Sequence, residues 1–305
     1  MQSRLLHHFL IVCERRNITA AADFLHITQP ALTRSIHKLE KTIGAKLFER
    51  LPTGVALTTQ GEILARRARL MELEYRHALA EIRTLEHGLA GTLRIGAGPV
   101  WYSNLLPPVM AAFHKRFPKV RMRLTGGVIN TLIDGLLAGE IDLMCGTLDF
   151  RAQAEIAKEP LLRIRHAVAA RKGHPLVRQG AVSARELSLY PWLVLTDDQI
   201  GIGRIGAYFA ANGLAPPAIA IETNSYAMFK LLAQGDFLAH FPEQMLVDAQ
   251  KFGLTRIAHA GTFWDSEAGV AYRTTANPVK ALTSFISIIK VTLPARDRRR
   301  LGAAP

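Results

Sequence analysis

The chain has 305 residues, 49% of them hydrophobic, which allows two or three domains with sizeable cores. Its formal net charge of +13 indicates an anionic partner, because a positive field concentrates phosphate-bearing molecules; a basic surface without a partner is the alternative. The two cysteines, Cys13 and Cys145, lie in apolar stretches without metal-ligand spacing and argue against a disulfide framework or a structural zinc site.

The N-terminus and the apolar runs predict the compartment. Polar residues at positions 7, 8 and 14–16 interrupt the stretch where a signal peptide needs an apolar core. No apolar run approaches the roughly 18 residues that a membrane helix needs. We therefore expect a cytoplasmic protein. The 11 histidines show no metal spacing, so we expect no metal and no cofactor.

Residues 1–60 predict three short helices and a hairpin. In the first helix, apolar residues from Leu5 to Cys13 recur at helical spacing. Thr19 is expected to cap the second helix, in which the alanines at 20–22 allow a neighbouring helix to approach closely. Thr28 is expected to cap the third helix after a turn of about three residues. The second and third helices thus form a helix-turn-helix unit.

The third helix has two faces of opposite chemistry at about 100° per residue. One is apolar and is expected to be buried. The other carries a hydroxyl, two cations, an imidazole and an apolar ring, a combination that reads base edges and holds phosphates; a solvated face without a partner is the alternative. The apolar face consists of Leu32, Ile36, Leu39 and Ile43, and the outward face of Pro30, Thr33, Arg34, His37 and Lys38.

After Gly44, the segment AKLFERLPTGVALTTQG has strand-like residues on both sides of a turn-rich tip at 51–54. It predicts a two-stranded wing. A basic residue at the base of such a wing rests on the DNA backbone or reaches the minor groove, and Arg50 is the candidate.

The stretch ITAAADFLHITQPALTRSIHKLEKTIGAKLFERLPTGVALTTQGE resembles the signature of the LysR-type transcriptional regulators. The match lies in the paired alanines, the TQPALTRSIHKLE helix, the LFER turn and the LTTQG that ends the wing. Thr33 departs from the serine usual in the family but keeps the hydroxyl. The resemblance implies base and phosphate contacts by Gln29, Thr33 and Arg34, and contact of Pro30 with a thymine methyl. The full set of expected DNA-binding residues is Thr28, Gln29, Pro30, Thr33, Arg34, His37, Lys38 and Arg50.

Residues 61–90 predict a long linker helix. Apolar residues recur in steps of four and three, the a/d pattern of a coiled coil. A helix about 40 Å long cannot pack fully on a small domain. We therefore expect it to pair with a second copy of the chain in a homodimer or homotetramer; packing on its own C-terminal domain is the alternative. The seam consists of Leu64, Ala68, Met71, Tyr75, Ala78, Ile82, Leu85 and Leu89.

The rest of the chain alternates short apolar strands with helices, which predicts an α/β domain of two lobes with a ligand between them. This part also resembles the LysR effector domain, in LLPPVMAAFHKRFPKV, LIDGLLAGEIDLM and LLAQGDFLAHFPEQM. That domain resembles periplasmic binding proteins. The expected strands are LRIGAG, VRMRLTG, IDLMCG, HAVAA, WLVLT, AIAIE and FLAHF.

A ligand is expected beyond the carboxyl ends of these strands, where free N–H groups at helix starts attract anions. Trp101 offers a flat surface there, with a core role as the alternative. Relatives commonly carry a hydroxyl near Gly98; its absence here leaves backbone N–H groups and Ser103. Basic residues exceed acidic ones by more after residue 90 than before it, which favours an anionic effector or broad contact with bent DNA; ordinary solvation of a basic surface is the alternative. The candidates are Gly98, Pro99, Val100, Trp101, Ser103, Gly127, Val128, Thr147, Thr196, Asn224, Ser225 and Phe241, with Gly126 beside them.

Two other functions have some support in the sequence. Gly201, Gly203 and Gly206, with Glu222 after them, spell a dinucleotide fingerprint, but four residues separate the preceding strand from the first glycine. Since other catalytic motifs are also missing, we expect no enzyme. A solute-binding protein fused to a helical module would need an export signal.

The sequence therefore predicts an α/β protein with a winged helix-turn-helix at 1–60, a linker helix at 61–90 and an effector domain at 91–295. The second lobe is expected at about 165–265, and 296–305 is a basic tail. The predicted function is sequence-specific DNA binding, modulated by a small molecule held between the two lobes.

Overall fold

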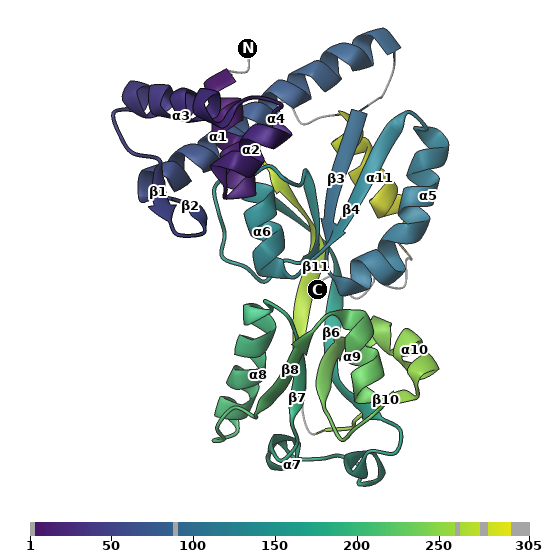
Figure 1. Ribbon diagram of the computed structural model, residues 1–305. Helices are drawn as coiled ribbons and strands as arrows, with labels where there is room; N and C mark the ends of the chain where they lie inside the picture. The colour runs from purple at the N-terminus through teal and green to yellow at the C-terminus, as the bar shows by residue number, and fades with distance from the viewer. Residues whose placement is uncertain (1–3, 88–90, 260–262, 275–279, 294–305) are drawn as a thin grey trace. The chain divides into compact units, whose positions relative to one another are not determined.

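The computed structural model describes residues 4–87, 91–259, 263–274 and 280–293 (Figure 1). The chain divides near residue 88 into two compact units. The predicted fold class is confirmed, with a helix-turn-helix unit at the N-terminus and a two-lobed α/β unit after it. Among the described helices, none combines the length and hydropathy needed to cross a membrane.

Over residues 4–87, the N-terminal unit consists of four helices and a two-stranded antiparallel hairpin, in which Arg50 lies opposite Val55. Its core is built around Phe9, Leu32 and Leu47, all fully buried. Full burial of each such side chain stabilises the fold by about 1.5–3 kcal/mol. The elements are α1 (Arg4–Arg15), α2 (Ile18–Phe24), α3 (Gln29–Ile43), β1 (Phe48–Leu51), β2 (Gly54–Leu57) and α4 (Thr59–His87).

The capping residues differ in part from the expected ones. Asn17, and not Thr19, caps α2, because its side chain accepts a 3.1 Å hydrogen bond from the backbone N–H of Ala20. Thr28 does occupy the position before α3, but its side chain makes no capping hydrogen bond. At the other end of α3, Gly44 has a φ of +77°, a left-handed conformation that glycine adopts without strain.

The C-terminal unit is built on a seven-stranded mixed sheet in the order β10-β6-β11-β5-β3-β4, with β9 also paired to β6. Strands β7 and β8 form a separate parallel pair. In Figure 1, α6 lies on one face of β3, β4 and β5, and α5 with α11 lies on the other. The elements of the first lobe are β3 (Gly91–Ala97), η1 (Trp101–Leu105), α5 (Leu106–Arg116), β4 (Val120–Gly126), α6 (Ile129–Leu137), β5 (Leu143–Thr147) and α11 (Lys280–Thr292).

Two long strands, β6 (Ile156–Arg171) and β11 (Trp264–Arg273), run antiparallel from one lobe into the other (Figure 1). The second lobe adds short elements on both sides of their far ends. These are η2 (Pro175–Arg178), α7 (Ala184–Ser188), β7 (Trp192–Leu195), α8 (Gln199–Ala211), β8 (Ile219–Thr223), α9 (Ser225–Leu232), β9 (Ala239–Pro242), η3 (Glu243–Met245), α10 (Leu246–Ala249), η4 (Gln250–Phe252) and β10 (Leu254–Arg256).

The register of the two long strands shifts at a bulge where they pass between the lobes. Pro160 lies opposite Gly269, and the shift falls between Ala268 and Gly269. A proline lacks the N–H of a regular ladder, so a bulge is where a sheet accepts it. A β-carbon at Gly269 would collide with the backbone carbonyl of Glu159, which explains the glycine.

Each of the seven expected strands is present, although HAVAA is only the end of the 16-residue β6. Strands β10 and β11 were not expected. The inward residues of β11 include Ser266, Ala268 and Gly269, which are too small to give an apolar signal. The predicted basic tail lies outside the described residues.

Candidate functional sites

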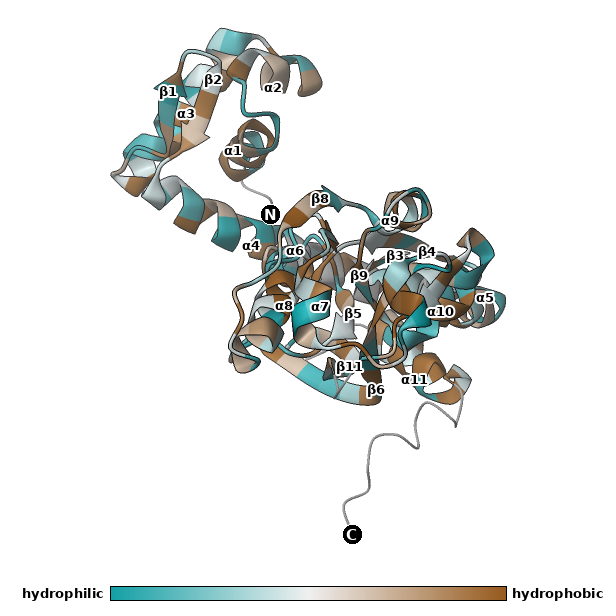
Figure 2. Ribbon diagram, turned by 90° about the horizontal axis from the view of Figure 1, so that it is seen from below, coloured by the Kyte–Doolittle hydropathy of each residue, from teal (hydrophilic) through white to brown (hydrophobic). Residues whose placement is uncertain are grey.

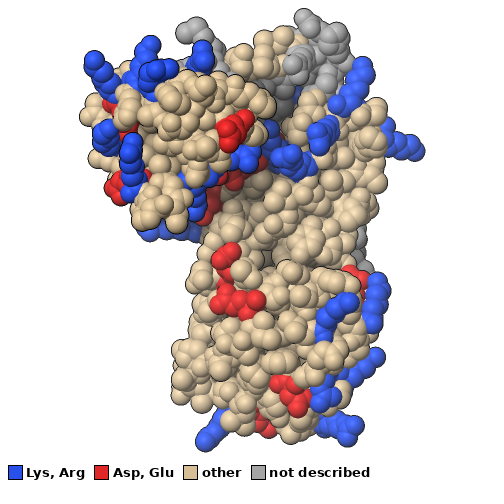
Figure 3. Space-filling model, viewed as in Figure 1, with Lys and Arg blue, Asp and Glu red and all other residues tan. Residues whose placement is uncertain are grey.

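The outward face of α3 is exposed along its length. Arg34, His37 and Lys38 are exposed, as are Thr28, Gln29 and Pro30 at the start, whereas Thr33 is half-buried. Thr33 accepts a 3.1 Å hydrogen bond from the side-chain amide of Gln29. Figure 3 shows lysine and arginine side chains gathered over this unit. The expected DNA-binding residues of α3 therefore share one accessible surface.

The opposite face of α3 is packed, with one exception. Leu32, Ile36 and Leu39 are buried as predicted, but Ile43 is 46% exposed, so its assignment to the buried face was wrong. Ile43 is the last residue of α3, because Gly44 ends the helix at the next position. Ser35, beside this face, lies 2.8 Å from Nδ1 of His8 on α1.

Glu40 joins the end of α3 to the start of the wing. Its buried carboxylate accepts hydrogen bonds from the backbone N–H of Leu47 at 2.9 Å and from Nζ of Lys46 at 3.0 Å. Nδ1 of His37 lies 3.2 Å away. Burial raises the pKa of Glu40, but these hydrogen bonds outweigh it and hold the pKa below its usual value. The carboxylate therefore stays ionised at neutral pH.

The wing presents Arg50 on an exposed strand position. Its second strand is fastened to the helical core, because the N–H of Val55 donates a 2.9 Å hydrogen bond to the carbonyl of Arg16. A β-carbon at Gly54 would collide with that same carbonyl. The close approach fixes where the hairpin, and hence Arg50, lies relative to α3.

Helix α4 ends at His87, and polar and apolar residues alternate along it (Figure 2). The first two seam positions do not face outward: Leu64 and Ala68 pack on the N-terminal core. The next ones are open, with Met71, Tyr75 and Ile82 between 43% and 54% exposed, and Ala78 is also exposed. Leu85 and Leu89 lie outside the described side chains.

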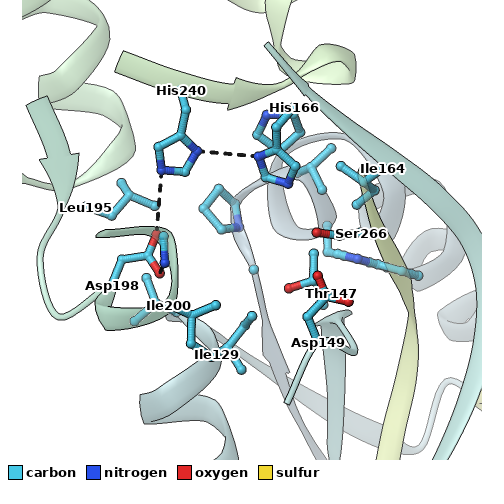
Figure 4. A pocket seen from close by; sticks show the side chains of 18 of the residues that line it. Ile129, Thr147, Asp149, Ile164, His166, Leu195, Asp198, Ile200, His240 and Ser266 are labelled. Atoms are coloured by element: carbon cyan, nitrogen blue, oxygen red, sulfur yellow. Dashed lines mark hydrogen bonds and ion pairs between the residues drawn. The ribbon is translucent and has the colours of Figure 1, made fainter. Parts of the chain in front are cut away.

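A cavity lies between the two lobes of the C-terminal unit and encloses about 840 Å³ of space, including its mouth. It is lined mainly by apolar side chains, among them Ile129, Ile164, Leu195 and Ile200 (Figure 4). The lining comes from the ends of β3 and β5, from α8 and α9, and from both crossing strands. Of the expected ligand-binding residues, those that line it are Gly98, Pro99, Val100, Trp101, Gly127, Val128, Thr147, Ser225 and Phe241.

A second, more open groove adjoins this cavity. Two further candidates for ligand binding, Thr196 and Asn224, line this groove together with Gly126. The hydroxyl of Tyr102, which also lines the groove, lies 2.8 Å from Oγ of Ser225 across the lobes. Ser103 lines neither space.

Trp101 is fully buried and belongs to the main core of the unit, although part of its surface lines the cavity. Its indole Nε1 is buried and has no hydrogen-bond partner among the described residues. Trp101 is thus both a core residue and part of the cavity wall.

Several backbone N–H groups at the helix starts already donate hydrogen bonds within the chain. Those of Trp101 and Tyr102 both donate to the carbonyl of Gly98, at 3.0 and 3.1 Å. At α8, the N–H of Gly201 donates to Asp198. At α9, the N–H of Ala227 donates to Asn224. These four amides are therefore bonded within the chain.

Sequence reasoning missed the most polar wall of the cavity. His166 on β6 and His240 on β9 lie side by side, with their Nδ1 atoms 3.4 Å apart, and Oδ2 of Asp198 lies 3.9 Å from Nε2 of His240 (Figure 4). Trp264 stacks on the His166 ring at 4.8 Å. Each of the two histidines is a single residue in a strand, so no sequence spacing connected them.

The charged side chains of the cavity are few. Arg204 forms an ion pair with Asp149 at 3.2 Å. Asp198 is the other carboxylate among the described lining residues. Within the described ranges, no cluster of three or more histidine, cysteine or acidic residues is placed to bind a metal ion.

The glycines of the dinucleotide fingerprint lie inside a helix. Gly201, Gly203 and Gly206 are all part of α8, and Asp198 caps that helix. A phosphate-binding loop needs its first glycine in the turn between strand and helix. This geometry does not fit a dinucleotide.

Two family models match the chain. Residues 3–62 match the bacterial regulatory helix-turn-helix of the lysR family, and residues 86–293 match the LysR substrate binding domain. A curated relative, the SDS degradation transcriptional activation protein of a Pseudomonas species, is 28% identical over 84% of each chain.

Solved structures share the fold. Full-length OxyR from Pseudomonas aeruginosa, as a variant, superposes with a TM-score of 0.67 at 21% identity, over 98% of this chain and 97% of that one. Full-length CbnR in complex with its target DNA also gives a TM-score of 0.67, at 22% identity, over 96% and 100%. The two family models match consecutive segments that together span most of the chain, and both belong to the same family. The protein is therefore a LysR-type transcriptional regulator, with a DNA-binding helix-turn-helix and an effector-binding domain.

Proposed function

We propose that the protein binds operator DNA through the outward face of α3 and Arg50 of the wing. The observation that carries this proposal is that α3 buries Leu32, Ile36 and Leu39 while its cations remain exposed. A helix held in this way can enter the major groove with its side chains on base edges. CbnR, which shares the fold, has been solved with its target DNA.

In this proposal, Gln29, Thr33 and Arg34 at the start of α3 contact bases and phosphates, and Pro30 lies against a thymine methyl. Thr28, His37 and Lys38 contact the backbone on either side. Arg50 reaches the backbone or the minor groove from the wing.

A small-molecule effector in the interlobe cavity would modulate this binding. The cavity is lined by both lobes, and β6 and β11 cross between them. A ligand that contacts both lobes favours the arrangement in which both contacts are made. Such a change at the lobes would be passed through α4 to the DNA-binding units.

The protein acts as a homodimer or homotetramer in this proposal, through the exposed residues of α4. It is a cytoplasmic regulator without catalytic activity, since its partner is DNA and its relatives are regulators.

The test is a footprint of the full chain on DNA upstream of its own gene, at fixed salt, combined with a thermal-shift screen of small molecules. We expect protected half-sites whose centres are a multiple of about 10 base pairs apart, because two copies bind one face of the duplex. A compound that raises the melting temperature should alter the footprint. A chain that gives no protection at any upstream or genomic fragment would contradict the proposal.

A further inference from the structure

The polar wall of the cavity has an unfilled hydrogen-bonding position. Nε2 of His166 is buried and, within the described part of the chain, has no hydrogen-bond partner. The His166 side chain lines the cavity and lies beside His240, on the side where Figure 4 shows Ser266 and Ile164. A buried polar atom without a partner is costly, so a ligand that pairs with it gains affinity.

The neighbouring groups decide whether this nitrogen donates or accepts. Asp198 faces Nε2 of His240 at 3.9 Å, and a carboxylate attracts an N–H and repels a lone pair. His240 therefore carries its proton on Nε2 and presents a lone pair at Nδ1. The contact between the two Nδ1 atoms then requires that His166 donate from Nδ1. Its Nε2 is left with a lone pair.

Both rings are neutral at pH 7. Burial lowers the pKa of His166 well below its usual value, and His240 and Arg204 act in the same direction. Burial also lowers the pKa of His240, against the opposing effect of Asp198. The pair therefore has one proton per ring, as the tautomer assignment needs.

The charged groups in the rest of the cavity do not favour an anion. Its one guanidinium among the described lining residues, Arg204, is paired with Asp149. Four helix-start amides of η1, α8 and α9 donate to groups of the chain itself. Two carboxylates, Asp149 and Asp198, line the space, and most of the other lining side chains are apolar.

We propose that the effector is a neutral, largely apolar molecule whose hydroxyl or N–H group donates a hydrogen bond to Nε2 of His166, and that Asp198, through His240, fixes this preference. The inference rests on the proposed function, since it names the ligand class for the same cavity. This neutral ligand differs from the anionic effector that the excess of basic residues after residue 90 favoured. Asp198 and His240 act here as positioning residues.

The first test needs no ligand. Nitrogen-15 spectra of the full chain, labelled at histidine, distinguish the two imidazole tautomers, and His166→Phe assigns the signals. We expect the Nδ1–H tautomer for His166 and the Nε2–H tautomer for His240. In Asp198→Asn, the new amide can donate to His240 while its oxygen still caps Gly201, so both tautomers should reverse. Asp149→Asn is the matched control, because it removes a cavity carboxylate away from the pair. An Nε2–H signal for His166 in the wild type would overturn the inference.

The second test measures affinity by calorimetry with three matched probes: 2-naphthol, naphthalene and 2-naphthoate. We expect 2-naphthol to bind about tenfold more tightly than naphthalene, because one net hydrogen bond separates them. It should also bind more tightly than 2-naphthoate, whose carboxylate oxygens accept hydrogen bonds and cannot donate to Nε2 of His166. His166→Phe should remove this advantage and leave naphthalene binding unchanged, which also shows that the cavity is intact. Asp198→Asn should shift the preference toward 2-naphthoate.

The outcomes distinguish an error in the ligand class from an error in the effector site. Tightest binding of 2-naphthoate to the wild type would overturn the ligand class and leave the cavity as the effector site. Failure of all three probes to bind the wild type, in calorimetry and thermal shift, would count against the cavity itself, and so against both the inference and the proposed effector site.

Discussion

The carboxylate of Glu40 accepts a 2.9 Å hydrogen bond from the backbone N–H of Leu47, seven residues later. This contact joins the end of α3 to the residue before the wing. Because the carboxylate is only 8% exposed and also holds Lys46, its ionised form is part of the fold. This side chain thus links α3 to the wing, the two elements proposed to contact DNA.

Glu40→Gln should lower the free energy of unfolding of the N-terminal unit by about 1–3 kcal/mol, because charge-assisted hydrogen bonds are replaced by neutral ones. Glu49→Gln, at an exposed wing position, is the control and should have little effect. The difference between wild type and Glu40→Gln should shrink below pH about 4. The pKa of Glu40 is lowered in the fold, so its stabilisation is present above the unfolded value of about 4.3 and is lost as pH falls through the folded one. Urea unfolding at several pH values measures both effects; a difference that stays constant with pH contradicts this role.

Arg34→Ala should weaken operator binding by about 1–3 kcal/mol without changing the melting temperature, because Arg34 is exposed on the outward face of α3. Arg185→Ala removes an equally exposed arginine from α7 and should leave affinity unchanged. Gel-shift titrations of both variants at one salt concentration make the comparison. Equal affinity of wild type and Arg34→Ala would remove this residue from the DNA-binding set.

Met71→Glu combined with Ile82→Glu should dissociate the oligomer, because both residues are more than half exposed on α4 and the change places like charges between paired helices. Arg66→Glu is the control on the same helix, since it lies about 180° around the axis from Tyr75. Light scattering should report a smaller particle for the double variant only. An unchanged mass with normal helicity would mean that the helices pair elsewhere.

Trp101→Ala should lower the free energy of unfolding by about 3–5 kcal/mol, because the side chain is fully buried and its removal leaves a large void. Ligand response and DNA binding should weaken together with the melting temperature. Tyr226→Ala removes an aromatic ring that is 62% exposed and should cost far less. Loss of the response at an unchanged melting temperature would instead favour a pure ligand contact for Trp101.

Stability should fall as the pH drops below about 6.5, in part through His174. Burial lowers the pKa of this fully buried ring, against the opposing effect of Asp236. The unfolded chain then binds more protons than the folded one between the lowered pKa and the ordinary value of about 6.5, so stability is lost as pH falls through that window. His174→Asn keeps an acceptor for the N–H of Leu176 and should flatten the slope, whereas the exposed His114→Asn should not. Identical slopes for all three proteins would exclude this contribution.

Local sequence patterns predicted most of the structure of the N-terminal unit. The outward set on α3 was readable because helical spacing alone separates Arg34 from Leu32, and the turn at 51–54 because proline and glycine select it. The errors there were local too: Asn17 competes with Thr19 for the same cap, and Ile43 follows the apolar spacing but falls at the last residue of the helix, beyond the packed core.

The effector cavity was predicted only where residues follow the end of a strand. Gly98, Thr147 and Ser225 were found in that way, since a parallel strand points its carboxyl end at the ligand. His166 lies within a strand that was expected to be short, and Trp264 and Ser266 lie on β11, which was not expected at all.

The sequence by itself determined the helix-turn-helix, the wing, the long helix α4 and the alternation of strands and helices, because each depends on residues close together in the chain. Only the tertiary structure decided which seam residues pack inward and how Asp198, His240 and His166 meet. These depend on contacts between residues as much as 74 positions apart, as for the two histidines, and on a register set by a bulge. Strand periodicity fixes which face a side chain takes, but only the pairing of distant strands fixes its neighbour.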